Sequence, residues 1–265
     1  MRDIFSLRDM RVAYDREEIV HGVSLGIREG EFCALLGLNG SGKTTILQAA
    51  CGLLPMTGSC VVAGQDCFGM NEKQRARLIA FIPQVCGRMS GKTVLEVVLM
   101  GFNAWLGLFE SPSAAHRKAA LGTLERLGCA PLAQKDFGAL SQGQRQIVIL
   151  ARCLVQNTPV MLMDEPDSAL DFLNRQKVLG KLREIIHVER KAGLISLHDP
   201  NFAMRYCDRL LLLDAGRLVG EIGMRGASKD AIEGKLSQIY GDIELYACGD
   251  DFFMGRPRPR RVRRG

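Results

Sequence analysis

Residues 37–44 read Gly-Leu-Asn-Gly-Ser-Gly-Lys-Thr and fit the pattern G-x-x-x-x-G-K-[ST] at every fixed position. Glycines let the backbone curl so that successive N–H groups point into one concavity, which attracts anions. In this pattern the lysine reaches the β- and γ-phosphates of a nucleotide, and the threonine hydroxyl is suited to bind Mg²⁺. The apolar run 31–36 predicts a buried strand before the loop, and residues 45–54 are compatible with a helix after it.

The sequence therefore predicts a phosphate-binding loop between a strand and a helix. The residues expected to contact the nucleotide in this segment are Gly37, Asn39, Gly40, Ser41, Gly42, Lys43, Thr44 and Thr45.

The composition is that of an ordinary soluble protein, with 47% hydrophobic and 24% charged residues in a chain of 265. No stretch approaches the ~18 uninterrupted apolar residues of a membrane span, and residues 1–9 lack the apolar core of a signal peptide. The nine cysteines form no C-x-x-C pair, which is typical of small buried side chains in a reducing compartment. We expect the protein in the cytosol or on the cytoplasmic face of the cell membrane.

The net charge of +6 is located at the end of the chain. The six arginines in residues 256–265 account for the whole net charge of +6. Residues 1–255 therefore have a net charge of zero and show no basic bias toward nucleic acid. The Pro- and Arg-rich segment contains too few apolar residues to fold. It is interpreted as a solvated disordered end, and weak attraction to anionic lipid or RNA is the alternative.

The hydrophobic pattern predicts alternating strands and helices. Short alternating runs within residues 1–30 are typical of antiparallel strands. Further strands are expected at 61–64, 78–83, 160–163, 194–197 and 210–213, and helices at 93–100, 114–127, 143–156 and 173–186. This alternation implies a parallel sheet covered by helices, into which a mostly helical segment is inserted.

A second candidate site follows the apolar strand 160–163, which ends in two carboxylates. Asp164 at the strand end can hold Mg²⁺ beside the phosphate loop. Glu165, one residue further, can polarise a water molecule for attack on the γ-phosphate.

Between these two sites the run Leu140-Ser141-Gln142-Gly143-Gln144 precedes an amphipathic helix. A serine hydroxyl and a glycine N–H at a helix start again favour an anion. The run resembles the L-S-G-G-Q signature of ATP-binding cassette (ABC) ATPases. Other positions match that family in order: the adenine-stacking aromatic residue (Tyr14), the Q-loop glutamine (Gln84), the D-loop aspartate (Asp171) and the switch histidine (His198).

The resemblance covers about residues 3–245 and implies an α/β fold, in which a P-loop NTPase (RecA-like) core carries an antiparallel β subdomain and an inserted helical subdomain. The implied division is an ATPase domain at 1–245, with the core at 1–84 and 159–230, the helical subdomain at about 85–158 and a C-terminal extension at 231–245. Residues 246–265 would form the tail, disordered at 256–265.

The resemblance also implies roles for single residues. Catalytic roles fall to Lys43, Gln84, Glu165 and His198, and Mg²⁺ binding falls to Thr44, Gln84 and Asp164. In this family two cassettes stack head to tail, so Ser141, Gly143 and Gln144 of one would contact the ATP held by the other, and Asp171 would reach across. The implied cofactors are ATP and Mg²⁺, and the implied first partner is a second copy of the chain.

Two positions depart from the family pattern. Gln142 replaces the first glycine of the signature and would be strained if residue 142 had a positive φ. Asp167 stands where threonine is usual, and its carboxylate either weakens nucleotide affinity or points to solvent.

The segments 93–101, 106–109 and 111–113, with 170–174 and 198–201, resemble importers of ferric siderophores, haem and cobalamin. The stretch 102–105 departs from that group, where a basic residue commonly follows Met-Gly, and it borders the groove expected to receive a permease helix. The sequence thus predicts an ATPase subunit of a metal-chelate importer, working beneath separate permease subunits and served indirectly by an extracytoplasmic substrate-binding protein. Two alternatives remain, a soluble cassette that regulates nucleic-acid processes and an ATPase of an exporter encoded as separate chains.

Overall fold

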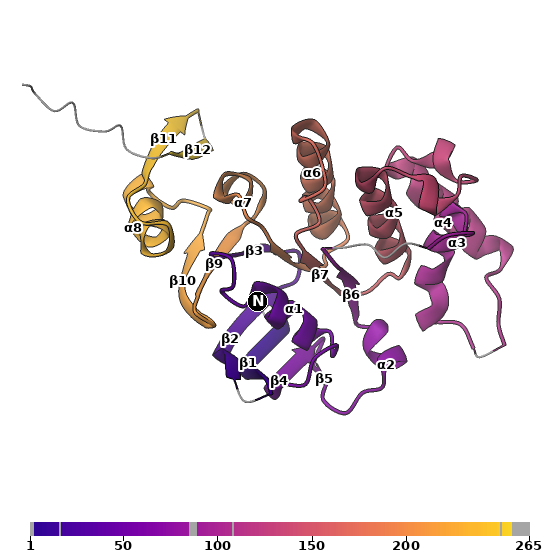
Figure 1. The fold of residues 1–265 in the computed structure, drawn as a ribbon, viewed down its shortest axis with the longest axis horizontal. Coiled ribbons are helices and arrows are strands. Elements are labelled where there is room, and N and C mark those ends of the chain that lie inside the picture. Colours follow the sequence, from indigo (N-terminus) through magenta and orange to yellow (C-terminus); the bar gives the residue numbers. More distant parts are fainter. Residues whose placement is uncertain (1–2, 16, 85–88, 108, 250, 256–265) are drawn as a thin grey trace, which may run out of the picture.

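The computed structural model describes residues 3–15, 17–84, 89–107, 109–249 and 251–255. Among these residues a six-stranded sheet forms the centre, in the order β10-β9-β3-β8-β7-β6 (Figure 1). Its strands are β3 (Phe32–Leu36), β6 (Ile79–Ile82), β7 (Val160–Asp164), β8 (Ala192–Ser196), β9 (Arg209–Asp214) and β10 (Arg217–Gly223). Neighbouring strands are parallel except that β10 pairs antiparallel with β9.

A second sheet is antiparallel and has the order β2-β1-β4-β5. It consists of β1 (Asp3–Tyr14), β2 (Glu17–Arg28), β4 (Thr57–Val62) and the short β5 (Gln65–Asp66). The antiparallel strands expected in residues 1–30 are therefore confirmed, and the structure adds the β4–β5 hairpin to them.

Helices cover the central sheet and form the inserted segment. They are α1 (Lys43–Ala50), α2 (Glu72–Ala76), α3 (Val94–Leu99), α4 (Ala114–Arg126), α5 (Gln142–Val155), α6 (Phe172–Val188), α7 (Pro200–Tyr206) and α8 (Lys229–Tyr240), with 3₁₀ turns η1 (Met100–Ala104), η2 (Ala130–Leu132) and η3 (Phe137–Ala139). Figure 1 shows α3, α4 and α5 grouped at one end, beyond β6. No described helix is both long and apolar enough to cross a membrane.

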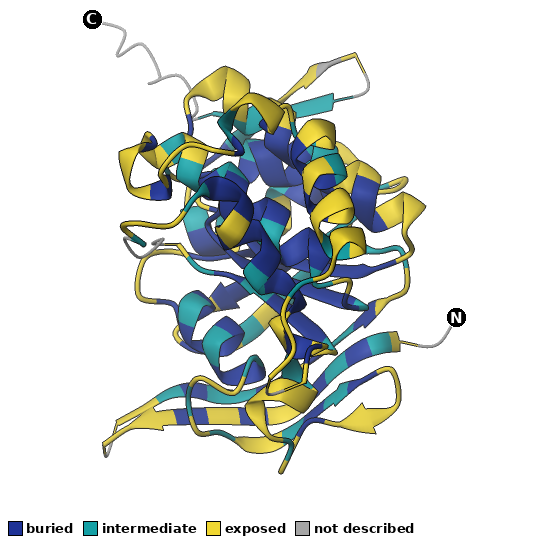
Figure 2. Cartoon of the chain, turned by 90° about the vertical axis from the view of Figure 1, so that its right-hand side faces the viewer, coloured by how far each residue is buried: buried dark blue, intermediate teal, exposed yellow. Residues whose placement is uncertain are grey.

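Side chains of β3 alternate between two cores. Phe32, Ala34 and Leu36 pack with helices α5 to α8, whereas Cys33 and Leu35 pack with α1 and the antiparallel sheet. All five residues of β3 are buried, because both faces of the central sheet are covered. Figure 2 shows buried residues along the central strands and exposed ones on the outer sides of the helices.

The C-terminal part of the fold extends further than the sequence indicated. After α8, strands β11 (Glu244–Cys248) and β12 (Asp251–Gly255) form a hairpin, and the N–H of Met254 donates a hydrogen bond to Asn201 Oδ1 at 2.6 Å. The boundary placed after residue 245 thus falls inside β11. The disorder predicted for 256–265 lies outside the described residues.

Gly193 on β8 tests how closely α6 packs on the central sheet. A Cβ atom there would lie 2.8 Å from Phe32 Cδ2 and 2.9 Å from Ile186 Cδ1. We expect Gly193→Ala to lower the free energy of unfolding by about 1–3 kcal/mol because it overpacks this core. Urea unfolding followed by circular dichroism measures the change.

The matched control is Gly122→Ala in α4, where an added Cβ has nothing within 4 Å. Alanine is favoured over glycine inside a helix by about 1 kcal/mol, so this variant should be more stable than the wild type. Equal effects of the two substitutions would contradict the packing argument.

Candidate functional site

The phosphate loop lies between β3 and α1, as the sequence predicted. Gly42 caps α1 with φ +103°, and Gly40 has φ +80°, so both occupy the left-handed region that favours glycine. A Cβ at Gly37 would lie 2.3 Å from the Leu213 carbonyl oxygen, so only glycine fits against the end of β9.

Lys43 is buried at the start of α1. Its ammonium donates hydrogen bonds to the carbonyl oxygens of Gly37 (2.9 Å) and Leu38 (3.2 Å). Burial lowers the pKa of Lys43, and the carboxylates of Glu165 and Asp164 oppose that shift. Two of the three ammonium donors bind loop carbonyls, which leaves one for a phosphate.

Asp164 at the end of β7 joins three elements through one oxygen. Its Oδ1 accepts hydrogen bonds from Thr44 Oγ1 at 3.1 Å and from Ser196 Oγ at 2.8 Å. Ser196, directly opposite on β8, also accepts the N–H of Glu165 at 2.9 Å. A carboxylate beside a threonine hydroxyl is an oxygen donor set that suits Mg²⁺.

Glu165 is held from two sides. Its Oε2 accepts a hydrogen bond from Gln84 Nε2 at 2.5 Å and lies 2.6 Å from His198 Nε2. The Glu165 side chain is 6% exposed, while that of His198 is 49% exposed. The backbone of Glu165 has φ +45°, a left-handed conformation that costs a non-glycine residue about 1–3 kcal/mol.

A pocket of about 520 Å³ lies against the phosphate loop, Glu165 and His198, and the predicted residues Gly37 and Asp164 are not among those that line it. Its walls hold most of the predicted nucleotide and catalytic residues: Tyr14, Asn39, Gly40, Ser41, Gly42, Lys43, Thr44, Thr45, Gln84, Glu165 and His198. Ser41 Oγ is buried with no hydrogen-bond partner within the described residues, as expected of a group that binds a phosphate oxygen. The lining of the pocket therefore fits the phosphate groups of a nucleotide.

The signature residues lie elsewhere. Ser141 caps α5 in a reciprocal capping box with Gln144, and both line a separate pocket with Gly143 and Asp171. Asp171 caps α6 by accepting the N–H of Asn174 at 2.9 Å, and this hydrogen bond lowers the pKa of Asp171. The structure thus brings the predicted residues together in two groups rather than one.

Gln142 is unstrained. It is the first residue of α5, and its φ is not among the positive ones of the described residues. A glycine is therefore not required at this position in the signature of this chain.

Asp167 does not point to solvent, which corrects one of the two expectations for it. Asp167 as a whole is 5% exposed, and its Oδ2 lies 3.1 Å from Arg175 Nε on α6. The Arg175 guanidinium stacks on the Phe202 ring of α7, 5.2 Å from the centroid. The extra carboxylate thus links the segment after Glu165 to the two helices that follow it.

Sequence reasoning missed Ser196 and Arg175. A polar residue within the apolar strand Leu194–Leu197, two positions before His198, was the available signal for Ser196. Arg175 carried no such signal, because its partner and its aromatic neighbour come from other elements.

A phosphate loop, an Asp-Glu pair at a strand end and a histidine beside that pair, all at one edge of a parallel sheet, are typical of a P-loop nucleotide hydrolase. The model of the ABC transporter family matches residues 20–168. The chain belongs to this family and is one of its ATP-hydrolysing cassettes. The predicted family and fold class are thereby confirmed.

Similar proteins and structures span most of the chain. A Helicobacter pylori protein named "Probable iron chelatin transport ATP-binding protein" is 35% identical over 217 residues, which are 81% of this chain and 85% of the relative. The structure of an inward-facing metal-chelate type ABC transporter aligns with TM-score 0.78 and 25% identity over 96% of each chain. The dimeric structure of the bacterial cassette MJ0796 aligns with TM-score 0.75 and 30% identity, over 84% of this chain and 100% of that one.

Asp167 also gives a stability that depends on pH. Burial raises its pKa, which Arg175 opposes and Glu165 reinforces. A carboxyl group with a higher pKa in the folded chain lowers the free energy of unfolding as pH rises above its ordinary value of 3.8. Asp167→Asn keeps an acceptor for Arg175, so it should gain stability relative to the wild type between pH 3.8 and neutrality.

Urea unfolding at a series of pH values measures this difference. A difference that shrinks or reverses as pH rises would show that the ion pair with Arg175 outweighs the burial of Asp167.

Proposed function

We propose that this chain is the ATPase subunit of an importer for a metal chelate, such as a ferric siderophore, haem or cobalamin, and works with separate permease subunits. The observation that carries the ATPase part is the Glu165 carboxylate, held by Gln84 and His198 in the wall of the phosphate-loop pocket. The import part is supported by the similarity to an iron chelatin transport protein and to a metal-chelate type transporter.

The pocket residues would divide the work as follows. The N–H groups of the phosphate loop, the Ser41 hydroxyl and Lys43 would hold the phosphates, and Tyr14 would stack on adenine. Thr44, Asp164 and Gln84 would hold Mg²⁺, which screens phosphate charge when bound. Glu165 would take a proton from the attacking water, and His198 would hold the γ-phosphate in line with it.

Glu165→Gln tests the assignment of the base. The amide keeps the size of the side chain but cannot accept the proton of water, so we expect ATP binding to persist and the turnover rate to fall by 10²–10⁴-fold, roughly the contribution of a general base. Steady-state ATP hydrolysis and equilibrium nucleotide binding measure the two quantities. Turnover at the wild-type rate would remove Glu165 from this role.

The two separate pockets support a head-to-tail dimer. Because Ser141, Gly143, Gln144 and Asp171 line a different pocket from the phosphate loop, they would meet a nucleotide held by a second copy. A similar cassette is known as a dimer. In this arrangement ATP bridges the two copies and hydrolysis releases them.

The permease partner places the protein at the cytoplasmic face of the membrane as a peripheral subunit, and the substrate-binding protein acts outside. Residues 102–105 border the groove that we expect to receive a permease helix. Within this stretch the Trp105 side chain is held in place, since its Nε1 donates to the Gln156 carbonyl oxygen at 2.8 Å and the Arg77 guanidinium lies 5.3 Å from its ring centroid.

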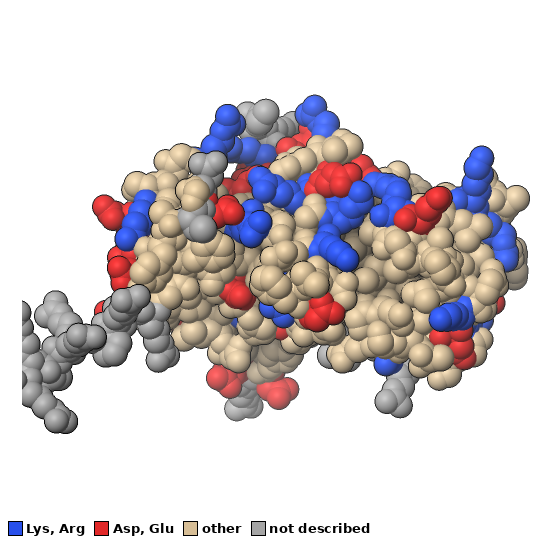
Figure 3. Space-filling model, turned by 90° about the horizontal axis from the view of Figure 1, so that it is seen from above, with Lys and Arg blue, Asp and Glu red and all other residues tan. Residues whose placement is uncertain are grey.

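Figure 3 shows basic and acidic side chains interspersed on the face it displays, rather than a continuous basic path for nucleic acid.

Affinity purification from detergent-solubilised native membranes tests the transport assignment. We expect a polytopic membrane protein in about equal amount, since the cassettes of this family act in pairs beneath two permease subunits. Recovery of the protein only from the soluble fraction, with bound RNA that is lost when residues 256–265 are deleted, would favour the soluble cassette that regulates nucleic-acid processes.

A second measurement separates import from export. ATP hydrolysis by the reconstituted complex should rise when an external substrate-binding protein is added. If the ATP hydrolysis rate does not change with any substrate-binding protein that is encoded beside the permease, the exporter alternative is favoured.

A further inference from the structure

Two buried thiols lie opposite each other on the β4–β5 hairpin, away from the ATP pocket. Val61 pairs with Asp66 across this hairpin, so the same register places Cys60 opposite Cys67. The Cys67 N–H donates a hydrogen bond to the Cys60 carbonyl oxygen at 2.8 Å, while the Cys60 thiol donates to the Ala50 carbonyl oxygen at 3.8 Å. Residues opposite each other in antiparallel strands have Cα atoms about 4.5–5.5 Å apart, within the range of about 4.4–6.8 Å that disulfides span.

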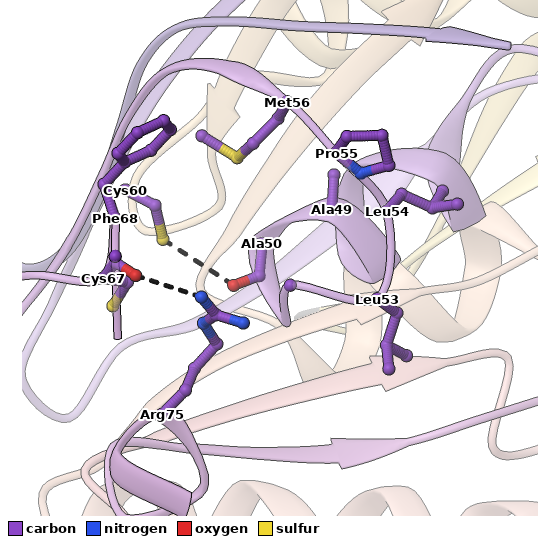
Figure 4. Close-up of a pocket in the computed structure, with 12 residues that line it drawn as sticks. Ala49, Ala50, Leu53, Leu54, Pro55, Met56, Cys60, Cys67, Phe68 and Arg75 are labelled. Atoms are coloured by element: carbon purple, nitrogen blue, oxygen red, sulfur yellow. Dashed lines mark hydrogen bonds between the residues drawn. The ribbon is translucent and has the colours of Figure 1, made fainter. Parts of the chain in front are cut away.

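Both cysteines line a pocket of about 410 Å³ between the end of α1, the hairpin and α2 (Figure 4). Each is only 3% exposed over the whole residue, so the pocket is the route to them. Leu53 and Phe68, which also line the pocket, are more than 60% exposed and mark its solvent side. The pocket has room for a small molecule to reach the two sulfur atoms.

The surroundings make the two thiols unequal. The adjacent Cys60 side chain and the Arg75 guanidinium lower the pKa of Cys67, although burial opposes this. Arg75 is fixed there because it donates to the carbonyl oxygens of Cys67 and Met70, both at 3.1 Å. The adjacent Cys67 side chain and burial raise the pKa of Cys60.

Four other described cysteines differ from Cys67. Burial raises the pKa of Cys33, Cys51, Cys129 and Cys207. Since the thiolate is the reactive form, Cys67 is the favoured nucleophile of this group.

We propose that Cys60 and Cys67 are a redox-active dithiol, which a low-molecular-weight disulfide entering the pocket oxidises to an intramolecular disulfide. The Cys67 thiolate attacks one sulfur of the small disulfide, forming a mixed disulfide and releasing one small thiolate. Cys60 then loses its proton and attacks the Cys67 sulfur, which releases the second small thiolate. The protein loses two electrons and two protons, and the small disulfide becomes two thiols.

The test treats the reduced, full-length, native protein with hydroxyethyl disulfide. Samples are quenched in time with iodoacetamide and mapped by mass spectrometry, while the ATP hydrolysis rate reports on the native fold. We expect a linked peptide joining residues 60 and 67 to form before Cys129 or Cys207 is modified. The proposal fails if the pair stays reduced, or if the other thiols react at the same rate.

Serine variants test the order of the two steps. Cys60→Ser should accumulate the hydroxyethyl mixed disulfide at Cys67, because the second thiol is gone. Cys67→Ser should slow modification of Cys60 at least about tenfold, since a buried thiol with a raised pKa provides little thiolate. If Cys60 in the Cys67→Ser variant is modified as fast as the 60–67 pair is oxidised in the wild type, Cys67 is not the attacking thiol.

Cys129→Ser is the matched control. Cys129 is also buried, and its pKa is raised, but it lines a different pocket. This variant should form the 60–67 link at the wild-type rate. A faster rate would mean that the reaction requires loosening of the whole fold, and would overturn access through the pocket.

Discussion

The catalytic edge of this molecule depends on one carboxylate oxygen. Asp164 Oδ1 accepts hydrogen bonds from Thr44 on α1 and Ser196 on β8, while Asp164 itself ends β7. Three segments far apart in the chain are thereby held at one point inside a buried region. A hydrogen bond to a charged group contributes about 1.5–3 kcal/mol, so the two bonds stabilise this junction. They fix the start of α1 and the end of β8 relative to the Asp-Glu pair that ends β7.

The second level of organisation is the order of strands in the central sheet. Because β3, β8, β7 and β6 are adjacent and parallel, their carboxyl ends lie along one edge. Lys43, His198, Glu165 and Gln84 follow these four strands in the same order. Ligands of open parallel sheets bind at this edge, so the strand order explains why residues from four distant segments share one pocket.

The sequence signals that predicted the residues of this pocket are local. The phosphate loop begins where the apolar run 31–36 ends, and the Asp164-Glu165 pair follows the run 160–163. A run of that kind identifies a buried parallel strand. The link from Asp167 through Arg175 to Phe202 was not predictable, since it joins α6 and α7 across the fold. The hairpin at 244–255 was interpreted as tail for a related reason. Its strands are short and only partly buried, and contacts with α7 rather than an internal pattern stabilise it.

The left-handed backbone of Glu165 has a consequence for how this chain can change. Natural proteins are rarely at their stability optimum, and glycine at residue 165 would relieve the conformational strain there. The same substitution would delete the carboxylate that Gln84 and His198 hold. Selection for thermal stability and selection for ATP hydrolysis therefore act in opposite directions at this residue. A protein selected only for stability would tend to lose the Glu165 carboxylate, and ATP hydrolysis with it.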